Sequence, residues 1–201
     1  MQDLAQPGAA QRVFEQTQSL GLEIDILINN AGFGGHGKFH ERPLAREQQM
    51  MQLNMVTLTE LTHLYVRGMV AKGSGKVLNV SSTAGFMPGP LQAVYYATKA
   101  YVNSFSQAIA NELQDTGVTV TALCPGAVDT GFQQAGDLEG VDMWKLAVSA
   151  ESVARCGYRA MEKGKLLVIN QKVLAAALRG VVPLLPRKLL LKVSRTAMEK
   201  R

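Results

Sequence analysis

Short runs of β-branched and aliphatic residues alternate with longer segments of helical periodicity, and this alternation most constrains the fold. The strand-like runs are residues 24–28, 76–81, 118–124 and 165–169, and the helix-like segments are residues 7–20, 44–71, 94–113 and 151–163. Strands that alternate with helices form parallel sheets covered by helices on both faces. We therefore predict one α/β domain over residues 1–201, with a doubly wound parallel sheet and a basic, amphipathic helical region at 171–201.

Polar or turn-forming residues follow three of the predicted strands. The pairs after the first, second and third strands are Asn29–Asn30, Ser81–Ser82 and Pro125–Gly126. Ligands of such sheets bind in the crevice outside the carboxyl ends of the strands. We therefore expect a ligand site at this edge of the sheet.

Tyr95 and Lys99 begin the helix predicted after the second strand, four residues apart and therefore on one helical face. A phenol has a pKa near ~10 and needs assistance to exchange protons at neutral pH. At about 4 Å and an effective dielectric of 20, an ammonium would favour the phenolate by roughly 4 kcal/mol, which lowers the pKa by two or three units. The alternative is a surface tyrosine beside a solvated lysine. Convergence with the polar pairs favours an active site, although helical geometry does not choose between Tyr95 and Tyr96.

Composition excludes several other classes of protein. With 47% hydrophobic and 18% charged residues, the chain is typical of soluble globular proteins. The N-terminus lacks the features of a secretory signal, and the two cysteines fit a reducing, cytoplasmic location. The three histidines are scattered, so no metal site is expected.

Positive charge is concentrated at the C-terminal end. Residues 163–201 contain ten Lys or Arg and one acid, Glu199. Such a leucine-rich basic segment could make peripheral contact with an anionic membrane. The alternative, which we favour here, is a terminal helix that covers apolar surface and keeps its lysines in water. Nucleic-acid binding is not expected, because the segment lacks interleaved aromatic residues.

Taken together, the motifs resemble the short-chain dehydrogenase/reductase family, in its group with one Rossmann-like domain. The resemblance covers nearly the whole chain. It rests on Asn29-Asn30-Ala31-Gly32, Asn54, Ser82, Tyr95-x-x-x-Lys99 and Pro125-Gly126-x-Val128-x-Thr130. It implies a Rossmann-like doubly wound parallel sheet with about four of the usual seven strands.

The resemblance also implies an NAD(P)-dependent exchange between an alcohol and a ketone or aldehyde. Tyr95 would be the general acid or base, and Ser82 would hydrogen-bond the substrate oxygen. Lys99 would lower the Tyr95 pKa and hold the nicotinamide ribose, and Asn54 would position a water that links Lys99 to solvent. The alternative for Asn54 is a solvent-facing helical position. The family motif selects Tyr95 and Ser82 from their adjacent pairs.

The implied cofactor is NAD or NADP, which the sequence does not distinguish. Besides Tyr95 and Lys99, its contacts would be Asp3, Leu4, Asn30, Ala31, Gly32, Pro125, Gly126, Val128 and Thr130. Asp3 could instead cap the first helix. Apolar residues in segment 131–147 suggest an apolar alcohol or ketone as substrate, although they could simply pack that segment down.

One glycine-rich match is rejected as a phosphate site. Residues 32–37 fit G-x-G-x-x-G, but residues 38–43 separate them from any helix whose N-terminus could hold a pyrophosphate. In the family pattern Asp3–Leu4 ends the third strand, so we expect the N-terminal, glycine-rich part to be missing. Strand 24–28 would then be an apolar sheet edge, and we expect a homo-oligomer. The chain alone is expected to bind dinucleotide poorly and to be inactive.

Two other functions are considered. A non-catalytic remnant could act as an interaction protein, but the complete set Asn54, Ser82, Tyr95 and Lys99 disfavours it. A nucleotide-sugar epimerase-like enzyme shares the tyrosine–lysine chemistry, but only 71 residues follow Thr130, too few for its usual substrate domain.

Overall fold

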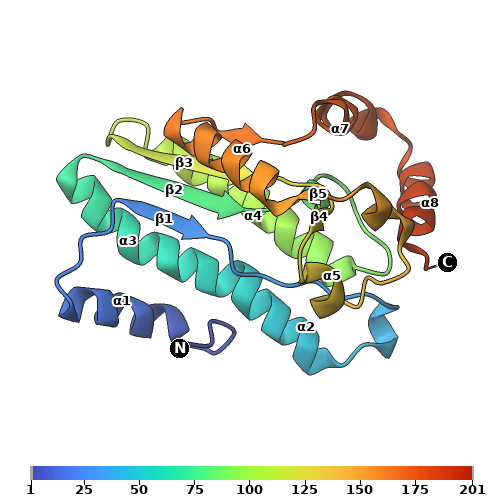
Figure 1. The fold of residues 1–201 in the computed structure, drawn as a ribbon, viewed down its shortest axis with the longest axis horizontal. Helices are drawn as coiled ribbons and strands as arrows, with labels where there is room; N and C mark the ends of the chain where they lie inside the picture. The colour runs from blue at the N-terminus through green and yellow to red at the C-terminus, as the bar shows by residue number, and fades with distance from the viewer. Residues whose placement is uncertain (1, 201) are drawn as a thin grey trace.

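A four-stranded parallel sheet organises the computed structural model, which describes residues 2–200 (Figure 1). The sheet order is β1 (Ile26–Asn29), β2 (Gly75–Val80), β3 (Val118–Leu123) and β6 (Leu167–Val168). Each neighbouring pair is parallel. The predicted α/β fold with a doubly wound parallel sheet is therefore confirmed.

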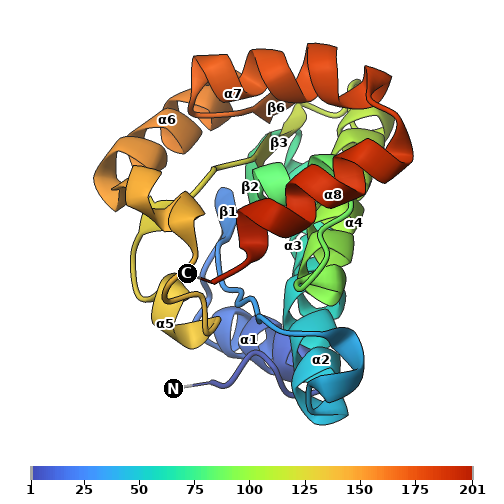
Figure 2. The same ribbon diagram turned by 90° about the vertical axis from the view of Figure 1, so that its right-hand side faces the viewer.

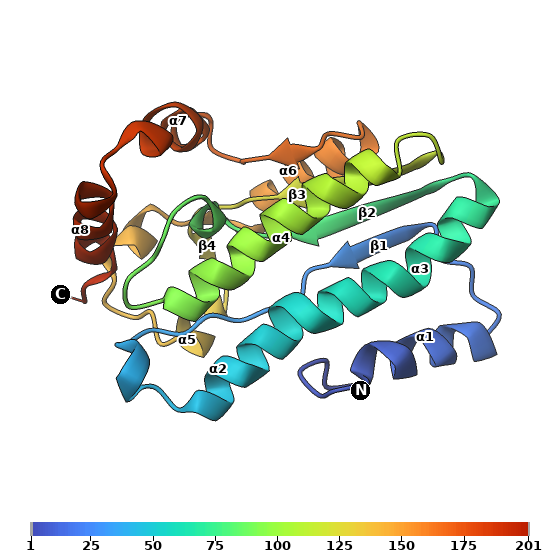
Figure 3. The same cartoon turned by 180° about the vertical axis from the view of Figure 1, so that it is seen from behind.

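Helices cover both faces of the sheet, as the end-on view shows (Figure 2). On one face, α3 (Leu58–Lys72) packs on the strands, and α4 (Ala93–Glu112) lies beside it (Figure 3). On the other face lies α6 (Ala150–Glu162). Side chains alternate between the faces of a strand. Val77 accordingly joins the cluster under α3, and Leu78 joins the cluster under α6.

The long helix predicted over 44–71 consists of three consecutive parts. α2 (Leu44–Met51) passes into a π-helix (Gln52–Thr57), which continues as α3. Gly73 ends α3 with a left-handed backbone at φ 73°, the conformation that favours glycine after a helix. Periodicity predicted the helix but not the π segment, and π turns are frequent at functional sites.

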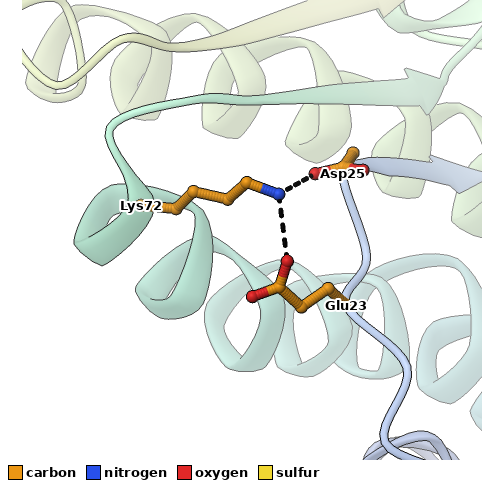
Figure 4. Close-up of polar contacts among 3 residues, drawn as sticks. All are labelled: Glu23, Asp25 and Lys72. Carbon is orange, nitrogen blue, oxygen red and sulfur yellow. Dashed lines mark hydrogen bonds and ion pairs between the residues drawn. The ribbon is translucent and has the colours of Figure 1, made fainter.

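At the opposite end of the sheet from the predicted site, ion pairs tie the start of β1 to the end of α3. Lys72 Nζ donates to Asp25 Oδ1 at 2.6 Å and to Glu23 Oε2 at 3.1 Å (Figure 4). Before this loop, α1 (Ala9–Ser19) packs on α3. Gly8 occupies the N-cap position of α1, so the alternative role of Asp3 as the cap of that helix is wrong.

The segment after β3 contains elements that the sequence did not predict. β4 (Val128–Asp129) pairs in parallel with β5 (Val148–Ser149). Between them lie α5 (Phe132–Ala135) and a 3-10 helix (Asp142–Leu146). Two further 3-10 helices lie in connecting loops, at Phe39–Glu41 and Thr83–Phe86.

Helices make up most of the C-terminal region. α7 (Lys172–Ala176) continues through a π-helix (Ala177–Val181) and a 3-10 helix (Val182–Leu184), and α8 (Arg187–Met198) follows. α7 and α8 form one end of the molecule, at the right of Figure 1 and toward the viewer in Figure 2. Within residues 2–200, no helix has the length and apolar character needed to cross a membrane.

Candidate active site

Ser82 and Tyr95 meet beyond the carboxyl end of β2. Ser82 has an extended backbone, and its Oγ accepts the Ala84 amide at 3.1 Å, which caps the 3-10 helix that follows. Tyr95 lies in the first turn of α4 and is 8% exposed. The Ser82 hydroxyl lies close enough to the phenol to oppose the effect of burial on the Tyr95 pKa. Ser82 is therefore a polar neighbour of the buried Tyr95 phenol.

The pKa of Tyr95 is raised, contrary to the expectation that Lys99 would lower it. Burial is the largest cause, because the phenolate loses its hydration, and the neighbouring Tyr96 adds to the increase. Lys99 Nζ lies 5.8 Å from the centroid of the Tyr95 ring and donates to the Val80 carbonyl oxygen at 2.9 Å. Its ammonium is therefore directed to the end of β2, and Ser82 is the group that favours the phenolate.

Lys99 is itself deeply buried, with 5% of its surface exposed. Desolvation lowers the pKa of Lys99 to about 8, and the nearby Cys124 thiol opposes this shift. Burial also raises the pKa of Cys124 to about 12, so the thiol stays neutral at physiological pH. The ammonium form of Lys99 is therefore poorly solvated in this environment.

Asn54 holds the loop after β1 against α4. Its Nδ2 donates to the Phe33 carbonyl at 3.0 Å and to Thr98 Oγ1 at 3.2 Å, and its Oδ1 accepts the Phe33 amide at 3.2 Å. Asn54 is 1% exposed, so the alternative of a solvent-facing position is wrong. The π-helix contains this residue, which is how a helical asparagine comes to face the loop and α4.

Gly32, in the loop after β1, lies beside Asn54 and Lys99. A Cβ atom built on Gly32 would lie 3.0 Å from Asn54 Oδ1 and 3.7 Å from Lys99 Nζ. A side chain at this position would contact both polar groups, the first of them tightly, so glycine leaves a gap beside them. A buried amine next to such a gap fits the hydroxyl groups of a ribose, so the residues present suit a dinucleotide.

Ser81 and Tyr96, which the family motif does not select, have other partners in the structure. Ser81 Oγ donates to a backbone carbonyl of α4 at 3.0 Å, which fastens that helix to β2. Tyr96 lies beside Ser194 of α8, and burial raises the pKa of Tyr96 to about 12. Ser82 and Tyr95 are therefore the serine and tyrosine that lie together.

Three of the predicted cofactor residues line one cavity beside β1. Leu4, Asn30 and Ala31 surround a largely apolar cavity of about 210 Å³, together with Ile28. Asp3 is not among its lining residues. The Asp3 carboxylate instead accepts the Ala5 amide at 2.9 Å, and this bond lowers its pKa.

The remaining predicted cofactor residues lie along the connection from β3 to α5. The Pro125 carbonyl accepts the Thr83 amide at 2.9 Å, which joins the ends of β2 and β3. Gly126 packs near Gln171 and Leu174, at the start of the C-terminal helices. Val128 of β4 pairs with Val148 of β5, and Thr130 Oγ1 accepts the Phe132 amide at 3.3 Å.

Tyr95 is surrounded by apolar residues of segment 131–147, which the sequence indicated for an apolar substrate, and by the C-terminal end, which the sequence did not indicate. The Phe132 ring lies 5.5 Å from the Tyr95 ring and 6.0 Å from the Trp144 ring. Met198 of α8 belongs to the same buried cluster, and its carbonyl oxygen lies 2.7 Å from His36 Nε2. The apolar composition of residues 131–147 was the only sequence signal for this group. No local pattern could have brought the C-terminal end to the loop after β1.

A buried polar network beneath the site was also missed. Asn29 Nδ2 donates to Asn79 Oδ1 at 2.8 Å and to Thr62 Oγ1 at 3.0 Å, and Asn79 Nδ2 donates to Ser106 Oγ at 2.9 Å. It connects β1, β2, α3 and α4. An asparagine inside the apolar run 76–81 was the signal available, because a buried amide requires partners.

Comparisons with known proteins agree with this arrangement. The family model for short chain dehydrogenases matches residues 1–139. The ketoacyl reductase HetN of Nostoc is 33% identical over 171 residues, which cover 82% of this chain and 58% of the relative. The 7beta-hydroxysteroid dehydrogenase of Collinsella aerofaciens is 33% identical over 173 residues, which cover 85% and 65%. The chain thus spans about three fifths of the length of these relatives.

Solved structures show the same fold. A 7beta-hydroxysteroid dehydrogenase superposes with a TM-score of 0.81 at 27% identity, over 96% of this chain and 74% of the other. A short-chain dehydrogenase from Sphingobium yanoikuyae, in complex with NADPH, has a TM-score of 0.78 at 26% identity, over 92% and 75%. The chain therefore belongs to the short-chain dehydrogenase family.

Proposed function

We propose that this protein is an NAD(P)-dependent oxidoreductase that interconverts a ketone and an alcohol. The observation that carries the proposal is the buried Tyr95 phenol beside Ser82, with Lys99 next to it at the carboxyl edge of the sheet. Relatives named as ketoacyl reductase and hydroxysteroid dehydrogenase support this reaction class. A similar structure contains NADPH, which supports a nicotinamide cofactor, either NAD or NADP.

In the proposed mechanism, Tyr95 transfers a proton to or from the substrate oxygen. Its raised pKa keeps the phenol protonated at neutral pH, so it is ready to act as the acid in ketone reduction. Ser82 would hydrogen-bond the same oxygen as negative charge develops on it. Bound NAD(P)H supplies the hydride. Lys99 would hold the nicotinamide ribose, and Asn54 would fix the loop that borders it.

An apolar substrate is proposed from the walls around the phenol. Phe132 and Trp144 stack at 6.0 Å between ring centroids, and Phe132 faces Tyr95. Aromatic walls of this kind bind apolar groups and exclude water from the reacting oxygen. The proposed substrates are therefore apolar ketones and alcohols.

The sequence predicts an inactive chain, but because Tyr95 lies beside Ser82 and Lys99, we propose instead that the 201-residue chain turns over slowly by itself. Residues 32–37, which match the dinucleotide fingerprint, lead into a 3-10 helix at Phe39–Glu41 and reach α2 only at Leu44. They do not present the amides of a helix N-terminus to a pyrophosphate. The cofactor would then bind mainly through its nicotinamide half.

Isotope transfer tests both proposals. The purified chain is incubated with a panel of apolar ketones and with NADH or NADPH deuterated at the nicotinamide, and mass spectrometry measures deuterium on the product alcohol. Labelled alcohol above a heat-denatured control supports the reaction, and its absence for every ketone with both cofactors contradicts it. A rate near the typical ~10 s⁻¹ of enzymes would contradict slow turnover.

A further inference from the structure

The helical stretch 172–184 is apolar on both of its sides. Leu174, Leu178 and Val182 face the core, where they pack in a cluster around the end of β3. On the other side Val173 is 86% exposed, and Leu184 is 83% exposed. A helix that is apolar all round is normally buried. Although the stretch also exposes Lys172 and Arg179, its exposed apolar residues indicate a surface that contacts an apolar partner.

The C-terminal helices also carry positive charge. Within residues 2–200 the structure gives no ion pair to any of four exposed bases in α7 and α8, which are Lys172, Arg187, Lys188 and Lys192. Residues 163–198 contain no Asp or Glu. Leu190, Ser194 and Met198 are the buried residues of α8, so helical period places Lys188 and Lys192 on its outer side.

The helices α7 and α8 form one end of the molecule (Figure 2). The positive charge of their exposed bases limits which kind of partner can bind there. A second copy in a two-fold dimer would place two identical basic faces against each other, which is unfavourable. Single-stranded nucleic acid binds by stacking on aromatic residues, and residues 163–201 contain none. An anionic bilayer offers both an apolar interior and acidic head groups.

We propose that the outer side of residues 172–192 docks on the surface of an anionic membrane. Val173, Val181 and Leu184 enter the boundary between head groups and acyl chains, and the bases contact lipid phosphates. α8 also donates a hydrogen bond from Ser194 Oγ to the Pro88 carbonyl at 3.0 Å. The docked surface is thus joined directly to the loop before Tyr95.

Vesicle sedimentation tests the proposal without any measurement of turnover. The 201-residue chain is mixed with phosphatidylcholine vesicles that contain or lack phosphatidylserine. We expect sedimentation with the anionic vesicles only, weakened by added salt. The double variant Val173→Glu, Leu184→Glu should abolish it, and both positions are so exposed that folding, checked by circular dichroism, is retained.

The charge contribution is measured with Lys188→Ala, Lys192→Ala. Each base near an anionic surface strengthens binding about fivefold, so the pair should weaken it roughly 25-fold. Arg12→Ala, Arg67→Ala is the matched control, because it removes two exposed charges from α1 and α3 and should leave binding unchanged.

Four results would overturn the proposal. The first is no sedimentation with either kind of vesicle. The second is equal loss of binding in the matched control. The third is self-association in ultracentrifugation that Leu184→Glu abolishes, because a second copy would then be the partner. The fourth is binding to single-stranded DNA that is tighter than vesicle binding and insensitive to Leu184→Glu.

Discussion

At the scale of single residues, Tyr95 and Tyr96 are neighbours with different surroundings. Both are buried, but Tyr95 contacts Ser82 near Lys99, whereas Tyr96 contacts Ser194 in α8. Tyr95→Phe should therefore lower the rate of labelled alcohol formation by about 10²–10⁴-fold, the usual contribution of a general acid. Tyr96→Phe should keep most of that rate. Equal losses of rate in the two variants would contradict a specific role of the Tyr95 hydroxyl in proton transfer.

Lys99 should give the protein a characteristic dependence of stability on pH. Its pKa falls from 10.5 to about 8 on folding, so between these values the unfolded chain binds more protons than the native one. The free energy of unfolding due to Lys99 therefore rises with pH across this window, and the penalty is present in full below pH 8.

Lys99→Met isolates this effect, because it keeps the length of the side chain and removes the charge. Urea denaturation at pH 7 and pH 10 should show wild-type stability rising relative to the variant by roughly 2–3 kcal/mol. The raised pKa of the Cys124 thiol is present in both proteins and largely cancels in the difference. A constant difference between the two proteins across this range would contradict the buried ammonium.

At the scale of elements, the π-helix between α2 and α3 should stabilise the loop after β1. Asn54→Ala removes three hydrogen bonds, two of them to the backbone of Phe33. We expect the free energy of unfolding to fall by about 2 kcal/mol and the Phe33 amide to exchange hydrogen faster. Thr98→Val removes one of these bonds and should cost less. Protection of the Phe33 amide that survives in Asn54→Ala would refute this role.

Elements with a local signal were predictable, and those set by distant contacts were not. Periodicity and apolar runs predicted all four strands of the main sheet and the helices α1, α3, α4 and α6 to within a few residues. Strand order also explains why Ser82 and Tyr95 meet. The β4–β5 pair is only two residues per strand, too short for a pattern, and it depends on the fold around it. The direction of the Lys99 ammonium depends on the Val80 carbonyl, which spacing does not report.

The turn before β3 gives a further test of element packing. Gly117 has φ 76°, and a Cβ atom there would lie 2.1 Å from the carbonyl oxygen of Gly73, at the end of α3. Gly117→Ala should therefore cost more than the 1–2 kcal/mol of left-handed strain alone. Gly21→Ala is the matched control, because Gly21 has φ 64° with open space around its Cβ position. Thermal denaturation of both variants measures the difference, and equal costs would exclude the clash.

At the scale of the whole molecule, the proposed site and the proposed docking surface are connected through one buried cluster of side chains. We propose that residues 2–200 act as a single domain, because the cluster around Tyr95 includes residues from α2, α4 and α8. Movement of α8 would therefore change the wall of the site. The opposite side of the sheet differs, because among the described residues 2–200 β1 pairs with β2 alone.

The free edge of β1 should make the protein associate with itself. Ile26 is 39% exposed and Ile28 is 49% exposed, beside the apolar cavity lined by Leu4. An unpaired apolar strand is a template for another strand, and a charge on it prevents such pairing. Ile28→Lys should therefore reduce the concentration-dependent mass measured by analytical ultracentrifugation.

Val173→Lys is the control for this prediction, because it adds the same charge to an exposed apolar residue at the α7 end. It should leave self-association unchanged if β1 is the site of pairing. A decrease with Val173→Lys but not with Ile28→Lys would place self-association at the C-terminal surface and would contradict pairing through β1. Since the two changes act at different ends of the molecule, their effects separate the sheet edge from the proposed membrane-docking surface.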